Sequence, residues 1–148
     1  MKIICYAFEN SEHQLESPFL NYLEKYSIQS NDSKKKKVIK IKQLANIEAH
    51  LDYLLDHQGS YDLPPTVQKY KATNIGILKI KESSTLVRIA FFTKKGEKII
   101  LLDAMDKPKL YEKGQKKRVD KLIQKFLNHV EKYRGDYLEN HKSLPLTF

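Results

Sequence analysis

Three basic residues lie in the most regularly patterned part of the chain and are the first candidates for a functional site: Lys79, Arg88 and Lys107. Such side chains bind anions, arginine through a planar fork that matches phosphate oxygens and lysine through a compact point charge. The whole chain is basic, with 27 Lys and Arg against 18 Asp and Glu and a formal net charge of +9. This surplus favours a polyanionic partner, which could be nucleic acid, the ribosome, an acidic protein or an anionic membrane; a merely solvated lysine-rich surface has the same composition.

Other kinds of chemistry find little support in the residues. The sequence has no glycine-rich phosphate loop, no Cys-x-x-Cys pair, no His-Glu-x-x-His and no Gly-x-Ser-x-Gly. Its 5 histidines are scattered, and only His50 and His57 could share a helix face, without a convincing third metal ligand. We therefore expect no metal, no cofactor and no acyl-transfer chemistry.

The basic candidates are expected on or next to a three-stranded antiparallel meander. Its strands are predicted at residues 75–81, 86–92 and 98–102. Alternating apolar and polar residues, β-branched residues and short polar connections are typical of strands joined by hairpins. Alternation places Lys79 and Lys81 on one face of the first strand and Leu78 and Ile80 on the other. The apolar face should meet helices, which leaves the lysine face open.

The other predicted elements complete one α+β domain that spans residues 1–148. They are a strand at 2–8, a helix over about 10–26, for which Pro18 is an alternative start, a second helix over about 38–57, a short helical turn at 67–71, a basic helix over about 114–133 and a tail at 141–148. We expect an antiparallel sheet of four to five strands, with the first two helices packed on it as a helical hairpin and the basic helix at the C-terminal end.

The second helix has an apolar stripe and a basic start. The stripe consists of Ile41, Leu44, Ile47, Leu51 and Leu54 at helical spacing. Four consecutive lysines at 34–37 precede it. Such a run is a weak nucleic-acid motif, because charge runs are usually solvated.

The compartment is predicted from the cysteine count and the hydropathy. A single cysteine, Cys5, cannot form an internal disulfide, which favours a reducing compartment. No apolar stretch has the length of a membrane span, and the apolar run at 3–8 is too short for a signal peptide. We therefore expect a cytoplasmic protein.

Over roughly residues 44–133, the order of elements and motifs resembles the RelE/HigB-like toxins of type II toxin–antitoxin systems, in particular their phage-derived HigB-like branch. Where those toxins have Glu-Leu-Arg at the end of the first meander strand, this chain has Ile-Leu-Lys79. Where they have Tyr-Arg in the second strand, it has Val-Arg88. Where they have a Phe followed by Lys-Lys, it has Met-Asp-Lys107-Pro.

The resemblance implies a RelE/ParE-like fold and a toxin that cleaves messenger RNA on the ribosome without a metal, by attack of the ribose 2′-OH on the neighbouring phosphate. In this interpretation Arg88, Lys107 and Lys79 are catalytic, with Arg88 as the main stabiliser of the phosphate charge. The residues implied in substrate binding are Lys81, Lys109 and Tyr111. The implied partners are a cognate antitoxin protein, RNA and the ribosome.

Two other functions stay open at this point. A ParE-like toxin would inhibit gyrase without cutting RNA, and the departures from the family motif at Lys79 and Pro108 are compatible with it. A non-toxic nucleic-acid-binding phage accessory protein would bind RNA or DNA with strong salt dependence. For Arg88 itself, the competing role is a structural ion pair with Asp103 or Glu97.

Overall fold

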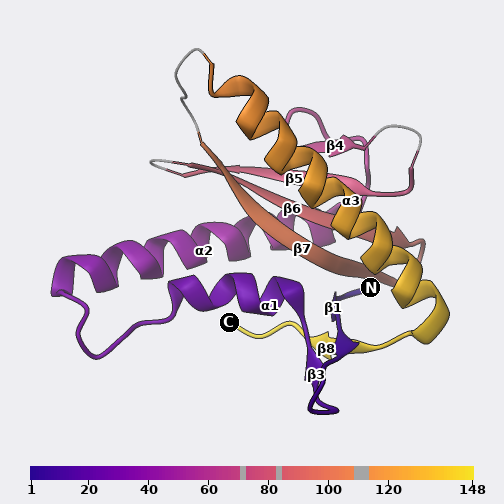
Figure 1. Cartoon of the computed structure of the whole chain (residues 1–148), viewed down its shortest axis with the longest axis horizontal. Coiled ribbons are helices and arrows are strands. Elements are labelled where there is room, and N and C mark those ends of the chain that lie inside the picture. Colours follow the sequence, from indigo (N-terminus) through magenta and orange to yellow (C-terminus); the bar gives the residue numbers. More distant parts are fainter. Residues whose placement is uncertain (71–72, 83–84, 109–113) are drawn as a thin grey trace.

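The computed structural model describes residues 1–70, 73–82, 85–108 and 114–148, and its centre is a six-stranded sheet with helices on both faces (Figure 1). The strand order is β4-β5-β6-β7-β1-β8. These strands are β1 (Lys2–Tyr6), β4 (Val67–Lys69), β5 (Gly76–Lys81), β6 (Thr85–Lys94), β7 (Lys98–Pro108) and β8 (Ser143–Pro145). A separate two-stranded sheet pairs β2 (Phe8–Glu9) with β3 (Leu15–Glu16).

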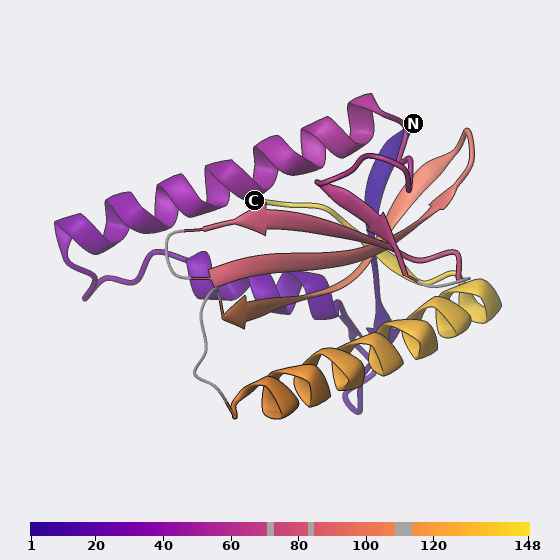
Figure 2. The ribbon, with the colours of Figure 1, turned by 90° about the horizontal axis from the view of Figure 1, so that it is seen from above.

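The described part of the chain contains three α-helices. They are α1 (Pro18–Leu23), which continues as the 3-10 helix η1 (Glu24–Tyr26), α2 (Lys34–Asp56) and α3 (Lys116–Asn140). Helix α1 begins at Pro18 because the Ser17 hydroxyl accepts a hydrogen bond from the Leu20 amide at 3.2 Å and proline suits the first helical turn. Figure 2 shows α2 and α3 on opposite sides of the sheet. None of the described helices is long and apolar enough to span a bilayer.

The predicted antiparallel sheet of four to five strands is wrong. The main sheet is mixed. Strand β1 runs parallel to β7, with Lys2 opposite Lys98 and Cys5 opposite Leu101, whereas all other neighbouring strands of this sheet pair antiparallel. Parallel neighbours need a long crossover connection, and here α1, α2 and five strands separate the two in sequence. The alternation of apolar and polar residues within a strand does not show whether the strand pairs parallel or antiparallel, so the parallel pairing of β1 with β7 could not be predicted from the sequence.

The predicted N-terminal helical hairpin is also wrong. Residues 8–16 form the β2–β3 hairpin instead of a helix, so α1 is short and begins at the alternative start, Pro18. It packs against β7 and β1, whereas α2 packs against β5 and η1. Residues 67–69 of the predicted helical turn at 67–71 form the edge strand β4, and residues 143–145 of the predicted tail pair with β1 as β8.

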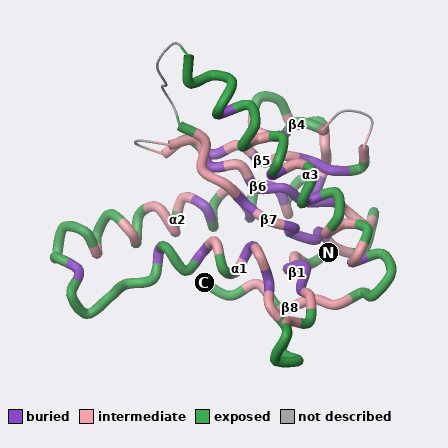
Figure 3. The backbone as a smooth tube through the Cα atoms, in the orientation of Figure 1, coloured by how far each residue is buried: buried purple, intermediate pink, exposed green. Residues whose placement is uncertain are grey.

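Side chains of the central strands point alternately into two cores. On one face, Val87, Ile89 and Phe91 of β6 pack with residues of α1, η1 and α2. On the other face, Ala90 and Phe92 pack with the apolar side of α3. Figure 3 shows these buried segments in the middle of the sheet and exposed backbone along the first half of α2, which extends past the sheet.

A β-bulge in β7 changes which side chains reach each face. Ala90 lies opposite Asp103 and Phe91 lies opposite Leu101, so Leu102 is an extra residue in β7. Before the bulge, odd-numbered residues of β7 face the α1–α2 core; after it, Ala104 does. The bulge therefore turns the odd-numbered residues beyond it, including Lys107, toward the α3 face.

Candidate functional site

Lys79, Arg88 and Lys107 come together on the α3 face of the sheet. Lys79 of β5 lies directly opposite Arg88 of β6 in the antiparallel ladder. Lys107 of β7 lies opposite Leu86, which places it diagonal to Arg88. Side chains in such positions are about 5 Å apart when opposite and about 7–8 Å apart when diagonal. The three cations predicted from sequence thus form one cluster, and the bulge in β7 is what brings the third onto this face.

The cluster lines a pocket of about 320 Å³ between the sheet and α3. Its sheet wall combines the three cations with Ile77 and Met105. Strand β4 and the residue after it add Gln68, a fourth cation, Lys69, and Tyr70. Its opposite wall is apolar and consists of Ile123, Phe126 and Leu127 of α3. The pocket therefore offers positive charge on one side and a hydrophobic surface on the other.

The described lining of this pocket contains no carboxylate to balance the cations. Burial is the main cause that lowers the pKa of Lys79, and the positive charges of Arg88 and Lys107 lower it further. Lys79 Nζ donates a hydrogen bond to Gln68 Oε1 at 2.6 Å. Burial also lowers the pKa of the Arg88 guanidinium, which still keeps its proton at neutral pH. Mutual repulsion in a half-buried site favours an anionic ligand between these groups.

Asp103 does not neutralise this cluster, although it lies on the same face of the sheet, opposite Ala90 of β6. The ion pairs of the described residues join neither Asp103 nor Glu97 to Arg88. Burial raises the pKa of Asp103 to about 6, whereas a cation in contact would lower it. Its Oδ1 instead accepts a hydrogen bond from the Ala104 amide at 2.8 Å. The structural role considered for Arg88 is therefore not observed in the described residues.

The residues implied in substrate binding are not all placed at the pocket. Lys81 is exposed at the end of β5 and does not line the pocket. Lys109 and Tyr111 lie outside the described residues. The sequence does not point to Gln68, Lys69 or Tyr70, because the segment that contains them is predicted to be a helical turn. It also gives no role to Phe126, although this buried residue forms part of the pocket wall.

The histidine side chains in α2 and at its C-terminal cap are hydrogen bonded to backbone carbonyls of the same helix. His50 Nδ1 is hydrogen bonded to the Asn46 carbonyl at 2.8 Å, and His57 Nδ1 to the Tyr53 carbonyl at 2.9 Å. In the described part of the chain, no group of three or more His, Cys, Asp or Glu side chains is arranged to hold a metal ion. The strongest chemical feature is therefore the cationic pocket, whose charge and size suit a phosphate-containing ligand.

Comparison with known proteins assigns no family. No protein-family model matches the sequence, and no curated protein matches it either. A function must therefore be proposed from the geometry of the cationic pocket and from the resemblance seen in the sequence.

Proposed function

We propose that this protein binds RNA in the cationic pocket and cleaves it as a metal-independent endoribonuclease. It would act in the cytoplasm as the toxin of a type II toxin–antitoxin system, cutting messenger RNA on the ribosome and held inactive by an antitoxin protein. One observation carries the proposal: Lys79, Arg88 and Lys107 line a single pocket whose described lining has no balancing carboxylate. These are also the positions at which the sequence resembles the catalytic motif of the RelE/HigB-like toxins.

The pocket supports a reaction in which the RNA supplies its own nucleophile. The 2′-oxygen of a ribose forms a bond to the adjacent phosphorus while the bond from phosphorus to the 5′-oxygen of the next nucleotide breaks. Arg88 can donate two hydrogen bonds to the phosphate oxygens, where negative charge develops in the transition state. Lys79 is the candidate to take the proton from the 2′-OH, because its lowered pKa raises the fraction of neutral amine. Lys107 can then return a proton to the leaving 5′-oxygen, which leaves a 2′,3′-cyclic phosphate and a 5′-hydroxyl.

A second function, RNA binding without cleavage, is favoured by the lack of a conventional base. The described residues that line the pocket include no carboxylate and no imidazole. Proton transfer then depends on a lysine, and Lys79 donates its hydrogen bond to Gln68. If that lysine stays protonated, the same pocket would hold a phosphate without promoting attack on it.

The two functions are separated by expressing the protein in a bacterial host and mapping the ends of its messages. Wild-type protein is expected to stop growth and to leave new 5′-hydroxyl ends in messenger RNA. Arg88→Ala should lower cleavage about 10²- to 10³-fold, the cost typical of removing one group that stabilises transition-state charge. Arg88→Lys should recover part of this loss, since it restores the charge without the fork.

Arg118→Ala is the matched control, because Arg118 is exposed on α3 and does not line the cationic pocket. It should leave growth arrest and cleavage unchanged. Intact messages after expression of folded wild-type protein would overturn the nuclease proposal. If RNA binding were nevertheless lost in Arg88→Ala and kept in Arg118→Ala, the second function would replace it.

A further inference from the structure

The first half of α2 carries apolar residues that the rest of the described chain does not cover. Its buried residues, Ile47, Leu51 and Leu54, all lie in the second half. The same stripe continues toward the N-terminus through Leu44 to Ile41, which is 55% exposed. Three of the five residues of the apolar stripe predicted from sequence are thus buried in the core, Leu44 is partly buried against it, and Ile41 lies open. An apolar stripe that continues past its own core marks an interaction surface.

These open residues form one wall of a second pocket, which we call the α2 groove. It has a volume of about 470 Å³ and lies between α1 and η1, the loop that follows them, α2 and the C-terminal segment. The residues that matter here are Leu23, Tyr26, Ile28, Ile41, Leu44 and Phe148. Ile28 and Phe148 are 49% and 50% exposed, so large apolar side chains border the groove on several sides.

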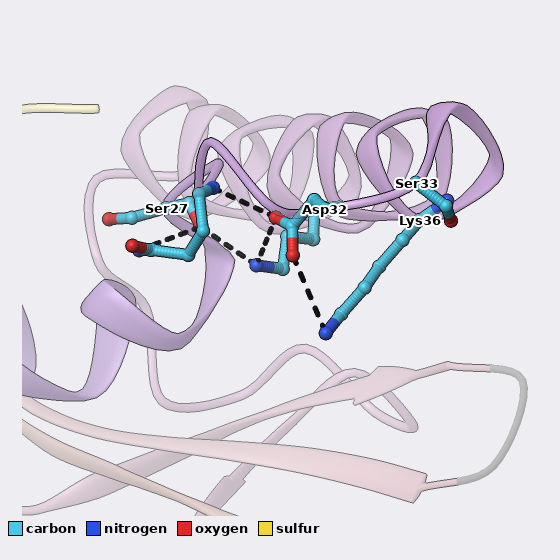
Figure 4. A network of polar contacts seen from close by, with 6 residues as sticks. Ser27, Asp32, Ser33 and Lys36 are labelled. Atoms are coloured by element: carbon cyan, nitrogen blue, oxygen red, sulfur yellow. Dashed lines mark hydrogen bonds and ion pairs between the residues drawn. The ribbon is translucent and has the colours of Figure 1, made fainter.

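Hydrogen bonds and ion pairs hold the loop between η1 and α2 in place, so the α2 groove is formed before a partner binds. Figure 4 shows the buried Asp32 carboxylate at the centre of this loop. It accepts hydrogen bonds from the Gln29 amide at 2.8 Å and from Lys40 Nζ at 2.7 Å, and Lys36 Nζ lies 3.4 Å away. Lys40 Nζ also donates to the Ser27 carbonyl at 2.8 Å. A preformed apolar groove avoids part of the entropy cost of binding.

The segment of α2 beside the groove is strongly positive, whereas the described lining of the groove itself includes one carboxylate, that of Glu24. Residues 34–42 include six lysines, and the first acidic residue of α2 is Glu48. Lys36 and Lys40 pair with Asp32, whereas no ion pair of the described residues involves Lys34 or Lys37. Helical spacing puts Lys34 and Lys37 on the same face as Ile41 and Leu44, in line with the groove.

These lysines are also unfavourable for the helix that carries them. The N-terminus of a helix has a partial positive charge, which acidic residues stabilise and basic residues destabilise. The first turn of α2 has no acidic residue, and the Ser33 hydroxyl caps it by accepting a hydrogen bond from the Lys36 amide at 3.1 Å. The lysines therefore oppose the helix dipole at a place that lies next to an exposed apolar surface. Such violations are expected where a residue serves binding rather than the stability of the fold.

We propose that the α2 groove binds an acidic amphipathic segment of a partner protein. Apolar side chains of that segment would enter the groove against Ile41 and Phe148, while its carboxylates would meet Lys34 and Lys37 and the N-terminus of α2. The groove is concave, which suits inserted side chains better than the flat surface of a bilayer, and RNA has no aliphatic side chains to fill it. The proposal does not depend on RNA cleavage, because the groove and the cationic pocket share no lining residue.

A display library of helical peptides, selected on the full-length protein and counter-selected on Ile41→Glu, tests this proposal directly. Enriched peptides are expected to be acidic and to place apolar residues at helical spacing. Their affinity should fall at least tenfold in Ile41→Glu and in the double variant Lys34→Glu/Lys37→Glu. The double variant should also melt at a higher temperature than wild type, since it replaces two positive charges near the helix N-terminus with negative ones.

Matched controls separate the groove from general effects of charge and hydrophobicity. Ile39 is 44% exposed on α2 but does not line the groove, so Ile39→Glu should leave peptide affinity unchanged. Lys116→Glu/Lys117→Glu changes two exposed lysines at the start of α3 and should do the same.

Several results would overturn the proposal. They are a library without any enriched Ile41-dependent sequence, enriched peptides that are not acidic, and Ile41-dependent binding of phosphatidylglycerol vesicles or single-stranded RNA in place of peptides. A dimer in sedimentation that Ile41→Glu dissociates would show that a second copy of this chain fills the groove.

Discussion

Replacing Asp103 with asparagine should stabilise the protein at neutral pH. Burial raises the pKa of this carboxyl from its usual value of 3.8 to about 6, which means that the folded protein disfavours its charged form. A shift of about two units corresponds to about 3 kcal/mol, at 1.36 kcal/mol per unit. Asparagine is neutral at every pH and keeps an oxygen that can accept the hydrogen bond from the Ala104 amide. We therefore expect Asp103→Asn to raise the free energy of unfolding by about 1–3 kcal/mol at pH 7.5.

The pH dependence of this gain has a definite sign. Below pH 4 the Asp103 carboxyl is protonated in the folded and the unfolded protein, so the substitution should have little effect. Between pH 4 and about 6 the unfolded chain loses the proton while the folded protein keeps it, so the stability of the wild type falls relative to the variant. Above about pH 6 the difference should stay constant. Other carboxyl groups titrate in both proteins and cancel when the two are compared at each pH.

Urea unfolding of both proteins at pH 4, 5, 6 and 7.5 measures this difference. Asp106→Asn is the control, because Asp106 points to the other face of β7, where its carboxylate accepts from Tyr22 Oη at 2.6 Å and pairs with Lys25. That substitution should lower the free energy of unfolding by about 1–2 kcal/mol. The reasoning is refuted if Asp103→Asn is no more stable than wild type at pH 7.5, or if its advantage does not shrink toward pH 4.

Three further predictions concern the fold that supports the two surfaces, each measured by chemical denaturation. Gly59→Ala should cost about 1–3 kcal/mol, because Gly59 has a φ of +66° and an added Cβ would lie 2.4 Å from Thr93 Oγ1. Leu51→Ala should cost about 2–5 kcal/mol, since Leu51 is 1% exposed in the core under α2. The pKa of Asp32 is lowered to about 2, chiefly by its hydrogen bond with Lys40, so its stabilising contribution is present above pH 4 and is lost as the pH falls toward 2. Asp32→Asn should therefore show a weaker loss of stability than wild type between pH 4 and pH 2.

The strands of the meander could be predicted from sequence because their patterns are local. Residues 75–81, 86–92 and 98–102 are found within or close to β5, β6 and β7. Alternation along β5 also assigned Lys79 to the face opposite Leu78, which is fully buried in the α1–α2 core. The partner and direction of β1 were not predictable in the same way, because they depend on contacts between segments distant in sequence.

The sequence indicated three cations as a candidate site, but not the arrangement of strands that brings them to one pocket. The face that Lys107 occupies is set by the extra residue Leu102 in β7, and no turn residue or proline marks this bulge in the sequence. The sequence predicted a basic helix in this region, and Phe126 on the apolar side of α3 is buried. That this helix also forms one wall of a pocket could not be read from its pattern, since the pattern does not say how closely a helix packs along its length.

The positions of the two surfaces predict that they act independently. The cationic pocket lies between the sheet and α3, whereas the α2 groove lies beyond the opposite face of the sheet. Effects of substitutions at separated sites without shared partners usually add within about 0.5 kcal/mol. Ile41→Glu should therefore leave RNA affinity unchanged, and Arg88→Ala should leave the affinity for acidic peptides unchanged. A partner confined to the groove would then bind the protein without blocking RNA, so a partner that inhibits cleavage must extend around the sheet to the pocket. Loss of RNA binding on addition of a groove-binding peptide too short to reach Arg88 would contradict this and would reveal coupling through the sheet.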